Sequence, residues 1–407
     1  MRANLEIDQT QTRRDNIINV HEIGPLGSSG GVLIDLDFDF NPPVRPLRSD
    51  FGIGAVGAGF IMRDVQLKAY ADAGFNVVAI TSRTPEIAQE VADLRGIPRV
   101  YDTLKGMLED PAVQILDIAV PPDQQLDIVR RAVGHAGHLK GILAQKPLAV
   151  NYDDAVELVE LCESSGLPLA VNQNMRYDQS IRALKTLLDR GALGTPVFAT
   201  IEMRAVPHWQ AWLRAYGRLT LLNMSIHHLD SFRYLFGDPE SIFVSVRKDP
   251  RTEFAHEDGI CLYILEYGNG LRASAWDDVW TGPRNDKDDL NPYIKWRVEG
   301  TGGLAEGTLG WPQYPNRNPS TLTFATSAQP GVWITPRWRD VWFPDAFQAP
   351  MADLMNAIAT RTCPATDGAG NLGTMALIEA GYRSIREHRP VALSEIRDCS
   401  AAVSQPD

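Results

Sequence analysis

Cysteine is scarce in this chain of 407 residues, which contains only Cys162, Cys261, Cys363 and Cys399. None of them forms a C-x-x-C pair, and their scatter is typical of reduced, packed thiols. The eight histidines also lack an H-x-x-x-H or H-E-x-x-H arrangement. The sequence therefore predicts no catalytic metal.

Long apolar runs are missing as well. No stretch reaches the roughly 18 apolar residues that a membrane helix needs, and residues 1–15 are polar and mixed in charge, unlike a signal peptide. Basic residues are outnumbered, because 39 Lys and Arg face 51 Asp and Glu, which gives a net charge of −12. Phosphate binding relies on clustered Lys and Arg. We therefore expect a cytoplasmic protein without a membrane or nucleic-acid partner.

The length and an apolar share of 44% predict two folded domains with appendages. Residues 1–50 form an N-terminal extension, in which residues 32–40 alternate apolar and acidic side chains with the period of a half-buried strand. Two interpretations remain open. The extension is either a mobile tail or an arm that adds a strand to a sheet edge, in this chain or in a partner subunit.

From residue 51 to residue 172, short apolar runs alternate with helical stretches. Strands are expected at 51–56, 76–81, 115–120, 141–144 and 168–171. Helices are expected at 60–73, 84–94, 103–108, 123–136 and 152–165. This alternation predicts an α/β fold with a parallel sheet covered on both faces, which is a doubly wound nucleotide-binding domain.

The pattern changes after residue 172. A helix at 178–190 is followed by strands with polar alternation, expected at 196–206, 241–248, 259–267, 270–277, 294–299 and 303–308. Residues 173–396 therefore form a second, mainly antiparallel α/β domain, and residues 397–407 form a tail. Helices that we expect to pack on the second domain lie at about 224–235, 346–359 and 371–387.

The first turn of the nucleotide-binding domain is Gly57-Ala58-Gly59. Glycines there let a pyrophosphate approach the backbone at a helix N-terminus, although Met62 stands where the dinucleotide fingerprint has Gly or Ala. The second strand ends at Ser82-Arg83, without the acidic residue usual in NAD-preferring domains. We expect NADP or NAD, with a slight preference for NADP. A surface arginine at a helix start would explain Arg83 equally simply.

A second informative feature is Gln145-Lys146-Pro147, which closes the apolar run 142–144. Burying an ammonium group is costly, so a lysine at the end of a buried strand usually has a function. The simpler alternative is a lysine in a surface salt bridge.

Several segments together resemble the glucose-fructose oxidoreductase, inositol dehydrogenase and rhizopine catabolism (Gfo/Idh/MocA) family over residues 51–396. They are the glycine turn, Val120-Pro121-Pro122, and residues 145–149, 171–177, 191–194, 223–230 and 376–390. The resemblance implies a Rossmann domain and an α/β domain whose open, largely antiparallel sheet often forms the oligomer interface. It thus implies a homo-oligomer, either a dimer or a tetramer.

The resemblance also implies catalytic residues. Lys146 matches the lysine of the family's Glu-Lys-Pro motif, with Gln145 in place of Glu, and its bond to Pro147 is often cis in relatives. His227 matches the family's catalytic histidine, and Asn223 stands where many relatives have Asp. Residues four apart share a helix face, so both can point at one hydroxyl. A packed helix histidine is the alternative for His227.

The remaining candidates are ligand contacts. The predicted cofactor-binding residues are Gly57, Gly59, Phe60, Ile61, Ser82, Arg83, Pro121, Gln125, Gln145 and Lys146. The predicted substrate-binding residues are Asn174, Arg176, His208, Trp209, Asn223 and His227. Gln125 stands where relatives often have a histidine, and Arg176 can equally be structural. Aromatic faces stack on sugar rings, so a chain with nine Trp favours a substrate as large as a glycoside, although core packing explains Trp as often.

These residues predict an NAD(P)-dependent oxidoreductase that oxidises a ring hydroxyl of a sugar, cyclitol or glycoside. His227 would take the hydroxyl proton while hydride passes to nicotinamide, and Lys146 would hydrogen-bond the same oxygen. Two alternatives remain open: a redox-assisted lyase or glycosidase that acts through a transient 3-keto sugar with tightly held cofactor, and a catalytically inactive sensor of the same fold. Net accumulation of reduced nicotinamide separates the first alternative from a dehydrogenase.

Overall fold

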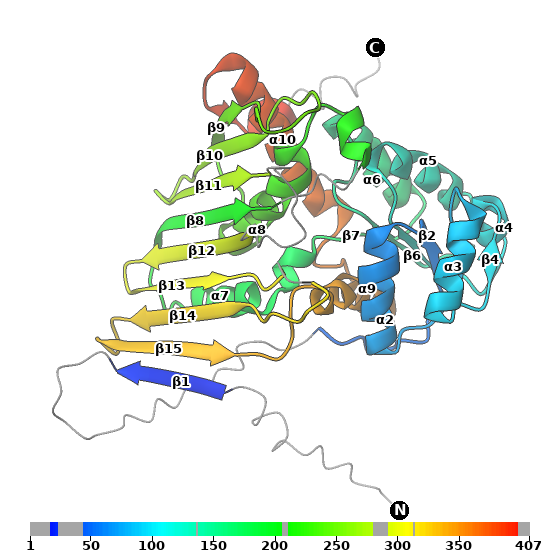
Figure 1. Cartoon of the computed structure of the whole chain (residues 1–407), viewed down its shortest axis with the longest axis horizontal. Helices are drawn as coiled ribbons and strands as arrows, with labels where there is room; N and C mark the ends of the chain where they lie inside the picture. The colour runs from blue at the N-terminus through cyan, green and yellow to red at the C-terminus, as the bar shows by residue number, and fades with distance from the viewer. Residues whose placement is uncertain are drawn as a thin grey trace, which may run out of the picture.

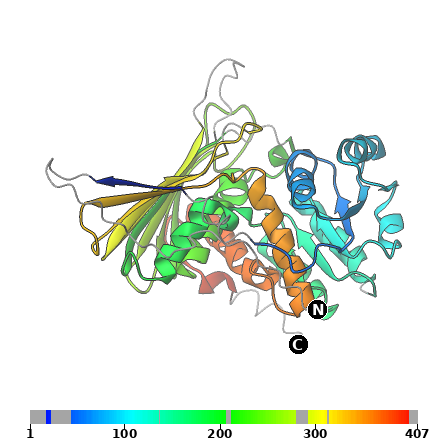
Figure 2. The same ribbon diagram turned by 90° about the horizontal axis from the view of Figure 1, so that it is seen from below.

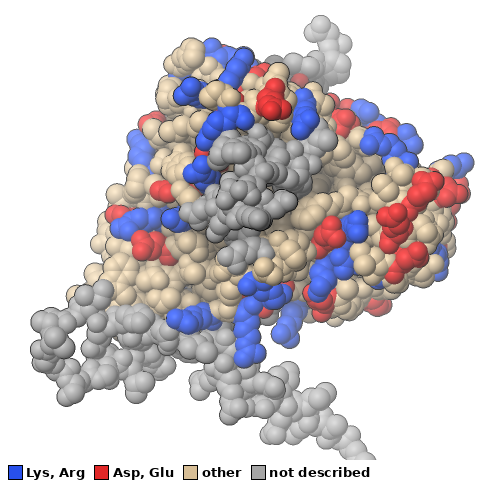
Figure 3. Space-filling model, viewed as in Figure 1, with Lys and Arg blue, Asp and Glu red and all other residues tan. Residues whose placement is uncertain are grey.

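The computed structural model describes residues 44–135, 137–205, 211–279, 292–311 and 314–397, and the backbone of strand β1 (Ile17–Glu22). The described residues form two lobes, each built on its own sheet (Figure 1). On the face drawn in Figure 3, acidic and basic side chains are interspersed. No helix in the described part of the chain is long and apolar enough to cross a membrane.

The first lobe is a parallel sheet with strand order β4-β3-β2-β5-β6-β7. Its strands are β2 (Ile53–Val56), β3 (Val77–Thr81), β4 (Val100–Tyr101), β5 (Ile115–Ile118), β6 (Gly141–Ala144) and β7 (Leu169–Val171). Its helices are the π-helical η1 (Ile61–Gln66), α2 (Leu67–Ala73), α3 (Pro85–Arg95), α4 (Leu104–Leu108), α5 (Pro122–Val133) and α6 (Tyr152–Ser164). The predicted doubly wound domain is therefore confirmed. Only β4 was not predicted, because two residues carry no periodic signal.

The second lobe contains a ten-stranded sheet, with strand order β1-β15-β14-β13-β12-β8-β11-β10-β9-β16 among the described residues. Its strands are β8 (Pro196–Arg204), β9 (Ser241–Arg247), β10 (Ile260–Glu266), β11 (Arg272–Asp278), β12 (Tyr293–Gly300), β13 (Gly303–Thr308), β14 (Thr321–Thr326), β15 (Val332–Arg337) and β16 (Val391–Ala392). The pairs are antiparallel except β8 with β11. A mainly antiparallel sheet is thus confirmed.

Helices lie on one face of this sheet, between it and the first lobe (Figure 2). They are α7 (Gln179–Asp189), α8 (Ile226–Phe236) and α10 (Gly368–Glu387). The described chain also has the short helical segments η2 (Asn174–Tyr177), η4 (Ala211–Ala215), η5 (Leu221–Ser225) and η6 (Asp345–Phe347). Residues of the strands alternate between buried and exposed, as β10 illustrates. One face of the sheet therefore belongs to the core and the other faces outward.

Helix α9 (Gln348–Thr360) departs from the prediction. We expected residues 346–359 to pack on the second domain, but α9 contacts β6 and β7 of the first sheet. Leu354 and Ile358 lie against Gly141, and Met351 shares a core with Phe51. The apolar face of a helix does not specify which of two sheets it covers, so the sequence could not decide this point.

The N-terminal extension contributes a strand to a sheet edge. Strand β1 pairs antiparallel with β15 along its length, from Ile17 opposite Arg337 to Glu22 opposite Val332. The strand that we predicted at 32–40 lies outside the described residues. Residues 17–22 thus add a strand to the sheet edge within this chain, a segment that we did not predict, and the arm interpretation of residues 32–40 stays a prediction.

Candidate active site

The loop after β6 carries Lys146, and the Lys146–Pro147 bond is cis. Gln125 of α5 holds this loop through hydrogen bonds to its backbone. Its Nε2 donates to the carbonyls of Gln145 at 3.0 Å, Pro147 at 2.8 Å and Leu148 at 3.1 Å, and its Oε1 accepts from the Gln145 N–H at 2.7 Å. Gln125 is fully buried, so its amide is engaged by the protein itself.

The Lys146 amine reaches across to the second lobe. Its Nζ donates to the Asn223 carbonyl at 2.7 Å and to Asn223 Oδ1 at 3.3 Å. Burial lowers the pKa of Lys146 to about 7, because a charged ammonium loses its hydration there. Near neutral pH the amine can therefore gain or lose a proton.

His227 lies one helical turn after Asn223 and is 7% exposed. Burial, the Lys146 amine and His228 all lower the pKa of His227 well below its usual value, so the imidazole is neutral at physiological pH. Its Nδ1 has no hydrogen-bond partner among the described residues. Lys146, Asn223 and His227 thus converge, and they present an amine and an unprotonated imidazole at the junction of the lobes.

The segment that carries His227 is hydrogen-bonded to Asp277 of the second sheet through Ser225. His228 Nδ1 lies 2.9 Å from Asp277 Oδ1 of β11, and both side chains are inaccessible to solvent. The Ser225 hydroxyl donates to the other oxygen of Asp277. The start of α8 is therefore fixed on the inner face of the second sheet.

Trp342 is a site residue that sequence reasoning missed. Its ring meets His227 edge to face, with centroids 5.8 Å apart, and its Nε1 donates to Asn174 Oδ1 at 2.9 Å. Trp311 packs against Trp342 in the same edge-to-face manner. The predicted residue Asn174 therefore lies at the site, where it holds this aromatic wall. Tryptophan richness at 309–344 was the available signal, but it did not say which rings face the site.

Arg176 has a different environment from the one predicted. Its guanidinium forms a two-pronged ion pair with Asp230, with Nη2 at 2.6 Å from Oδ1, and Nη1 donates to the Ala365 carbonyl at 3.2 Å. These contacts join η2 to α8, which supports the structural interpretation. The two remaining predicted substrate contacts, His208 and Trp209, lie outside the described residues.

The glycine turn follows β2, between the ends of β3 and β5. Gly57 has φ of 102°, and a Cβ there would lie 2.3 Å from the Ala119 carbonyl oxygen. A Cβ on Gly59 would meet nothing within 4 Å, so the backbone is open where the helix begins at Phe60 and Ile61. Such an exposed backbone at a helix start fits a dinucleotide pyrophosphate. Met62, the fingerprint exception, is fully buried in the core.

The other cofactor candidates surround this turn. Ser82 accepts a hydrogen bond from the Thr84 N–H at 3.0 Å, and Arg83 is exposed beside it. Pro121 precedes α5 at the end of β5. In the described part of the chain, no group of three or more His, Cys, Asp or Glu side chains is placed to bind a metal.

Two tyrosines of the second lobe contact the first lobe near these elements. The Tyr314 hydroxyl donates to the Asp64 carbonyl of η1, and its ring lies 6.2 Å from that of Phe60. The Tyr216 hydroxyl donates to Asp123 of α5 at 2.6 Å. The lobes are therefore joined at the elements that begin at the glycine turn and at Pro121.

The chain matches two family models in order. The model described as the oxidoreductase family with an NAD-binding Rossmann fold matches residues 51–173, and that of the Gfo/Idh/MocA C-terminal domain matches residues 181–306. Together these matches span more than half of the chain. They cover the sheet that carries Lys146 and the helix that carries His227.

Two of the named proteins with similar sequences are dehydrogenases. D-apiose dehydrogenase of Paraburkholderia graminis is 28% identical over 357 residues, which are 86% of this chain and 91% of that protein. Myo-inositol 2-dehydrogenase of Thermotoga maritima is 25% identical over 224 residues, which are 54% of this chain and 65% of that protein.

Solved structures share the fold. An oxidoreductase from Agrobacterium radiobacter, crystallised with NAD+, L-tartaric acid and magnesium, superposes with a TM-score of 0.72 at 24% identity, covering 85% of this chain and 99% of that one. The family models, the named relatives and this fold agree with one another, and the chain belongs to the Gfo/Idh/MocA family of oxidoreductases.

Proposed function

We propose that this protein is an NAD(P)-dependent dehydrogenase that oxidises a ring hydroxyl of a sugar, cyclitol or glycoside. The observation that carries the proposal is the contact of the Lys146 amine with Asn223, one helical turn before His227. A lysine in a surface salt bridge would not lie beside Asn223, and so would not bring its amine close to the imidazole of His227. Residues 51–172 would hold the cofactor, and residues 173–396 would supply the substrate site.

In this proposal, the neutral imidazole of His227 accepts the proton of the substrate hydroxyl. Lys146 hydrogen-bonds the same oxygen and, because its pKa is about 7, can relay that proton. Asn223 orients the lysine through its carbonyl and its side-chain oxygen. The bound nicotinamide supplies the hydride acceptor.

The cofactor would lie over the open backbone at Gly59, with its phosphates at the start of η1. The exposed Arg83, next to Ser82 at the end of β3, favours a ribose 2′-phosphate. We therefore propose NADP ahead of NAD. Phe60, Ile61, Pro121 and Gln145 remain predicted contacts at the same end of the sheet.

The substrate class follows from the walls of the site and from the relatives. Trp342 is buried against His227, and the half-buried Trp311 packs on it, so this aromatic cluster gives the site an apolar wall that suits the C–H face of a sugar or cyclitol. The relatives named above are dehydrogenases of D-apiose and of myo-inositol. D-apiose and myo-inositol are both polyhydroxylated, so we propose a polyhydroxylated substrate for this protein.

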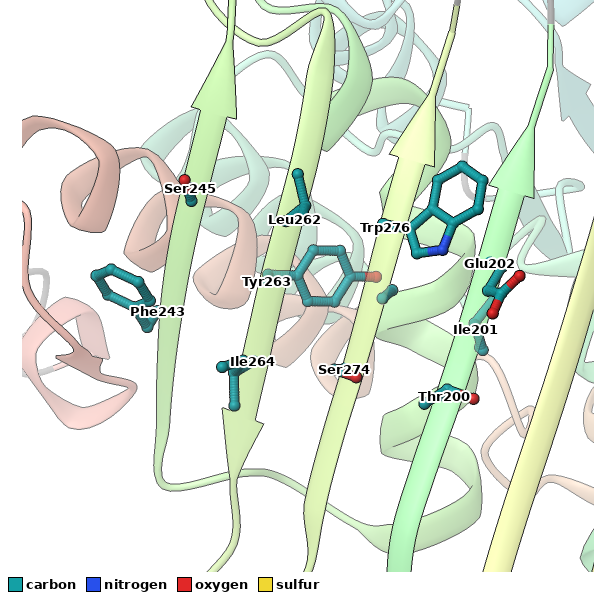
Figure 4. Close-up of a pocket in the computed structure, with 11 residues that line it drawn as sticks. Thr200, Ile201, Glu202, Phe243, Ser245, Leu262, Tyr263, Ile264, Ser274 and Trp276 are labelled. Carbon is teal, nitrogen blue, oxygen red and sulfur yellow. The ribbon is translucent and has the colours of Figure 1, made fainter.

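The outer face of the second sheet supports a homo-oligomer. Figure 4 shows Phe243, Leu262, Ile264 and Trp276 on neighbouring strands of this face. They are among the residues that line a hollow of about 330 Å³. Leu262 is 48% exposed and Ile264 is 45% exposed. An exposed apolar patch of this kind fits a second copy of the chain, so we propose that this face forms a dimer or tetramer interface. We also propose a cytoplasmic location, which suits the free thiols of Cys162 and Cys261.

The test is reduction of NAD+ and NADP+ with a panel of aldoses, inositols, anhydrosugars and aryl glycosides. We expect reduced nicotinamide to accumulate with at least one of them. Lys146→Met should lower kcat by about 10²- to 10⁴-fold. The matched control is Lys140→Met, an exposed lysine at the other end of β6, which should leave kcat unchanged.

Other outcomes would contradict the proposal. A Lys146→Met enzyme with wild-type kcat would refute the catalytic assignment. Turnover of a glycoside without net reduced nicotinamide would instead support a redox-assisted lyase or glycosidase. Tight cofactor binding without any turnover would support a sensor.

A further inference from the structure

Beneath the loop of Lys146 lies a buried chain of polar side chains that the proposed reaction does not use. It begins at Asp117 of β5, passes through Gln66 at the end of η1, and ends at Gln145. Tyr70 of α2 joins it at Asp117. Gln66, Tyr70 and Asp117 are each at most 1% exposed, and Gln145 is 9% exposed. Polar groups at this depth need hydrogen-bond partners, and these side chains supply them to one another.

The hydrogen bonds run in one direction. Gln145 Nε2 donates to Gln66 Oε1 at 2.8 Å, and Gln66 Nε2 donates to both oxygens of Asp117, at 3.0 and 2.9 Å. The Tyr70 hydroxyl donates to Asp117 Oδ2 at 2.8 Å, and Gln66 Nε2 also approaches that hydroxyl at 3.3 Å. An ionised carboxylate can only accept, so it fixes which end of the Gln66 amide faces it.

That direction determines which side chain fits at position 145. With its NH2 turned toward Asp117, Gln66 presents an oxygen to residue 145, which must therefore donate. Glutamine can donate and an ionised glutamate cannot. If Gln66 turned to serve a glutamate, its own oxygen would face Asp117, and two buried carboxylates would compete for one amide.

We propose that Asp117 is a positioning residue for Lys146: through Gln66 it requires a neutral donor at position 145 and so fixes the loop that carries the amine. The loop is then held from two sides, by Gln66 at the Gln145 side chain and by Gln125 at the Gln145 backbone. Burial raises the pKa of Asp117 to about 7, so the carboxylate is mostly ionised, and only accepts, above neutral pH. The experiment below is therefore set at a pH above 7, where the charge of Asp117 orients the chain.

The proposal predicts that the chain can be reversed. In the double variant Asp117→Asn/Gln145→Glu, the new amide at position 117 would donate to Gln66 Oε1, and Gln66 would donate to the new carboxylate at position 145. The Tyr70 hydroxyl would then donate to the oxygen of the amide at position 117. Each of these three pairs again joins a donor to an acceptor, with one carboxylate in the chain, so the two substitutions should compensate each other.

The experiment is a double-mutant cycle, measured by thermal unfolding and by steady-state kinetics. Gln145→Glu alone should lower Tm by about 5–10 °C, because it places two carboxylates around one buried amide. It should lower kcat by about tenfold or more with a smaller change in KM, because the lysine is displaced. Adding Asp117→Asn should recover at least half of the Tm loss and bring kcat to within about threefold of wild type.

The matched control is Asp258→Asn, combined with the same Gln145→Glu. Asp258 is also a fully buried carboxylate, but it accepts from the N–H groups of Leu219 and Leu221 and from Tyr382. Since it does not contact the chain, Asp258→Asn should recover neither Tm nor kcat.

Three results would overturn the proposal. The first is a Gln145→Glu protein whose Tm is within about 2 °C of the wild-type value. The second is an Asp117→Asn/Gln145→Glu variant that recovers no more Tm and kcat than the Asp258→Asn/Gln145→Glu control. The third is a Gln145→Glu variant with unchanged kcat, even if Asp117→Asn restores its Tm. The positioning role rests on the proposed oxidoreductase function, but the Tm cycle does not. If no substrate is turned over, the Tm values of the wild type, the two single variants and the double variant still show whether Asp117 determines which side chain fits at position 145.

Discussion

The two sheets of this protein bury their residues in different ways. In the first sheet, β2, β5 and β6 are buried at every position, because helices cover both faces. In the second sheet, β10 alternates strictly between inner and outer positions. The difference follows from the connections, since parallel strands need crossover helices and antiparallel hairpins do not.

This difference determines what each lobe can offer. A sheet covered on both faces is accessible at its strand ends, and Gly57 and Lys146 follow the carboxyl ends of β2 and β6. A sheet covered on one face offers a helix layer, which carries His227 on α8, and a free outer face. The proposed chemistry thus uses strand ends from one lobe and a helix from the other, and leaves the outer face for a partner.

The largest expected effect is at the glycine turn of the first sheet. Gly57→Ala should destabilise the fold by about 2–5 kcal/mol, because φ of 102° is strained for alanine and the Ala119 oxygen lies where the methyl would go. Thermal unfolding measures the loss, expected as a fall in Tm of about 5–15 °C. The control Gly59→Ala has open space around it, so it should keep Tm and weaken dinucleotide binding. Equal Tm values for Gly57→Ala and Gly59→Ala would contradict the conclusion that only position 57 requires glycine for the fold.

Sequence reasoning succeeded where a local pattern carries the information. Gly141–Ala144 is a short apolar run and forms β6 with the predicted bounds, so the position of Lys146 at a strand end was predictable. The four-residue spacing of Asn223 and His227 likewise placed both on one helical segment, although that segment begins as the π-helical η5.

The contacts that the sequence could not predict join residues far apart in the chain. Trp342 and Asn174 are separated by 168 positions, and Gln145 and Gln66 by 79. A tryptophan in a loop or a glutamine on a helix gives the same local signal whether it faces the site, the core or solvent. Strands β14 and β15 were missed for a related reason, because the Pro- and Asn-rich sequence around them obscures their short alternation.

An intermediate effect is expected on the outer face of the second sheet. Leu262 and Leu265 lie on the same strand but face opposite sides, with 48% and 0% exposure. Leu262→Asp should dissociate the proposed oligomer while changing the stability of the monomer by less than about 0.5 kcal/mol. Sedimentation velocity measures the assembly, and thermal unfolding measures the monomer.

Leu265→Asp is the matched comparison. It places a charge in the core and should unfold the second lobe rather than separate subunits. If Leu262→Asp sediments like the wild type, the outer face is not the interface.

The smallest expected effect concerns the point where the two lobes meet. Asn223→Asp places a carboxylate where Oδ1 now lies 3.3 Å from Lys146 Nζ. An opposite charge at this distance stabilises the ammonium, so it should raise the pKa of Lys146 from about 7. Because Lys146 can accept the relayed proton only as a neutral amine, the rate of oxidation should rise with pH through this pKa. The rising limb of the kcat/KM profile should therefore shift upward by about 1 pH unit or more.

At neutral pH the Asn223→Asp variant should be slower than the wild type, and at high pH the two should converge, because both amines are then neutral. The control Asn269→Asp adds the same charge on the hairpin of the second sheet, where residue 269 accepts the Leu271 N–H and a carboxylate can do the same. Its profile should match that of the wild type. A limb that stays in place in Asn223→Asp, or moves downward, would mean that Lys146 does not control the limb, and His227 would then have to act without a relay from the first lobe.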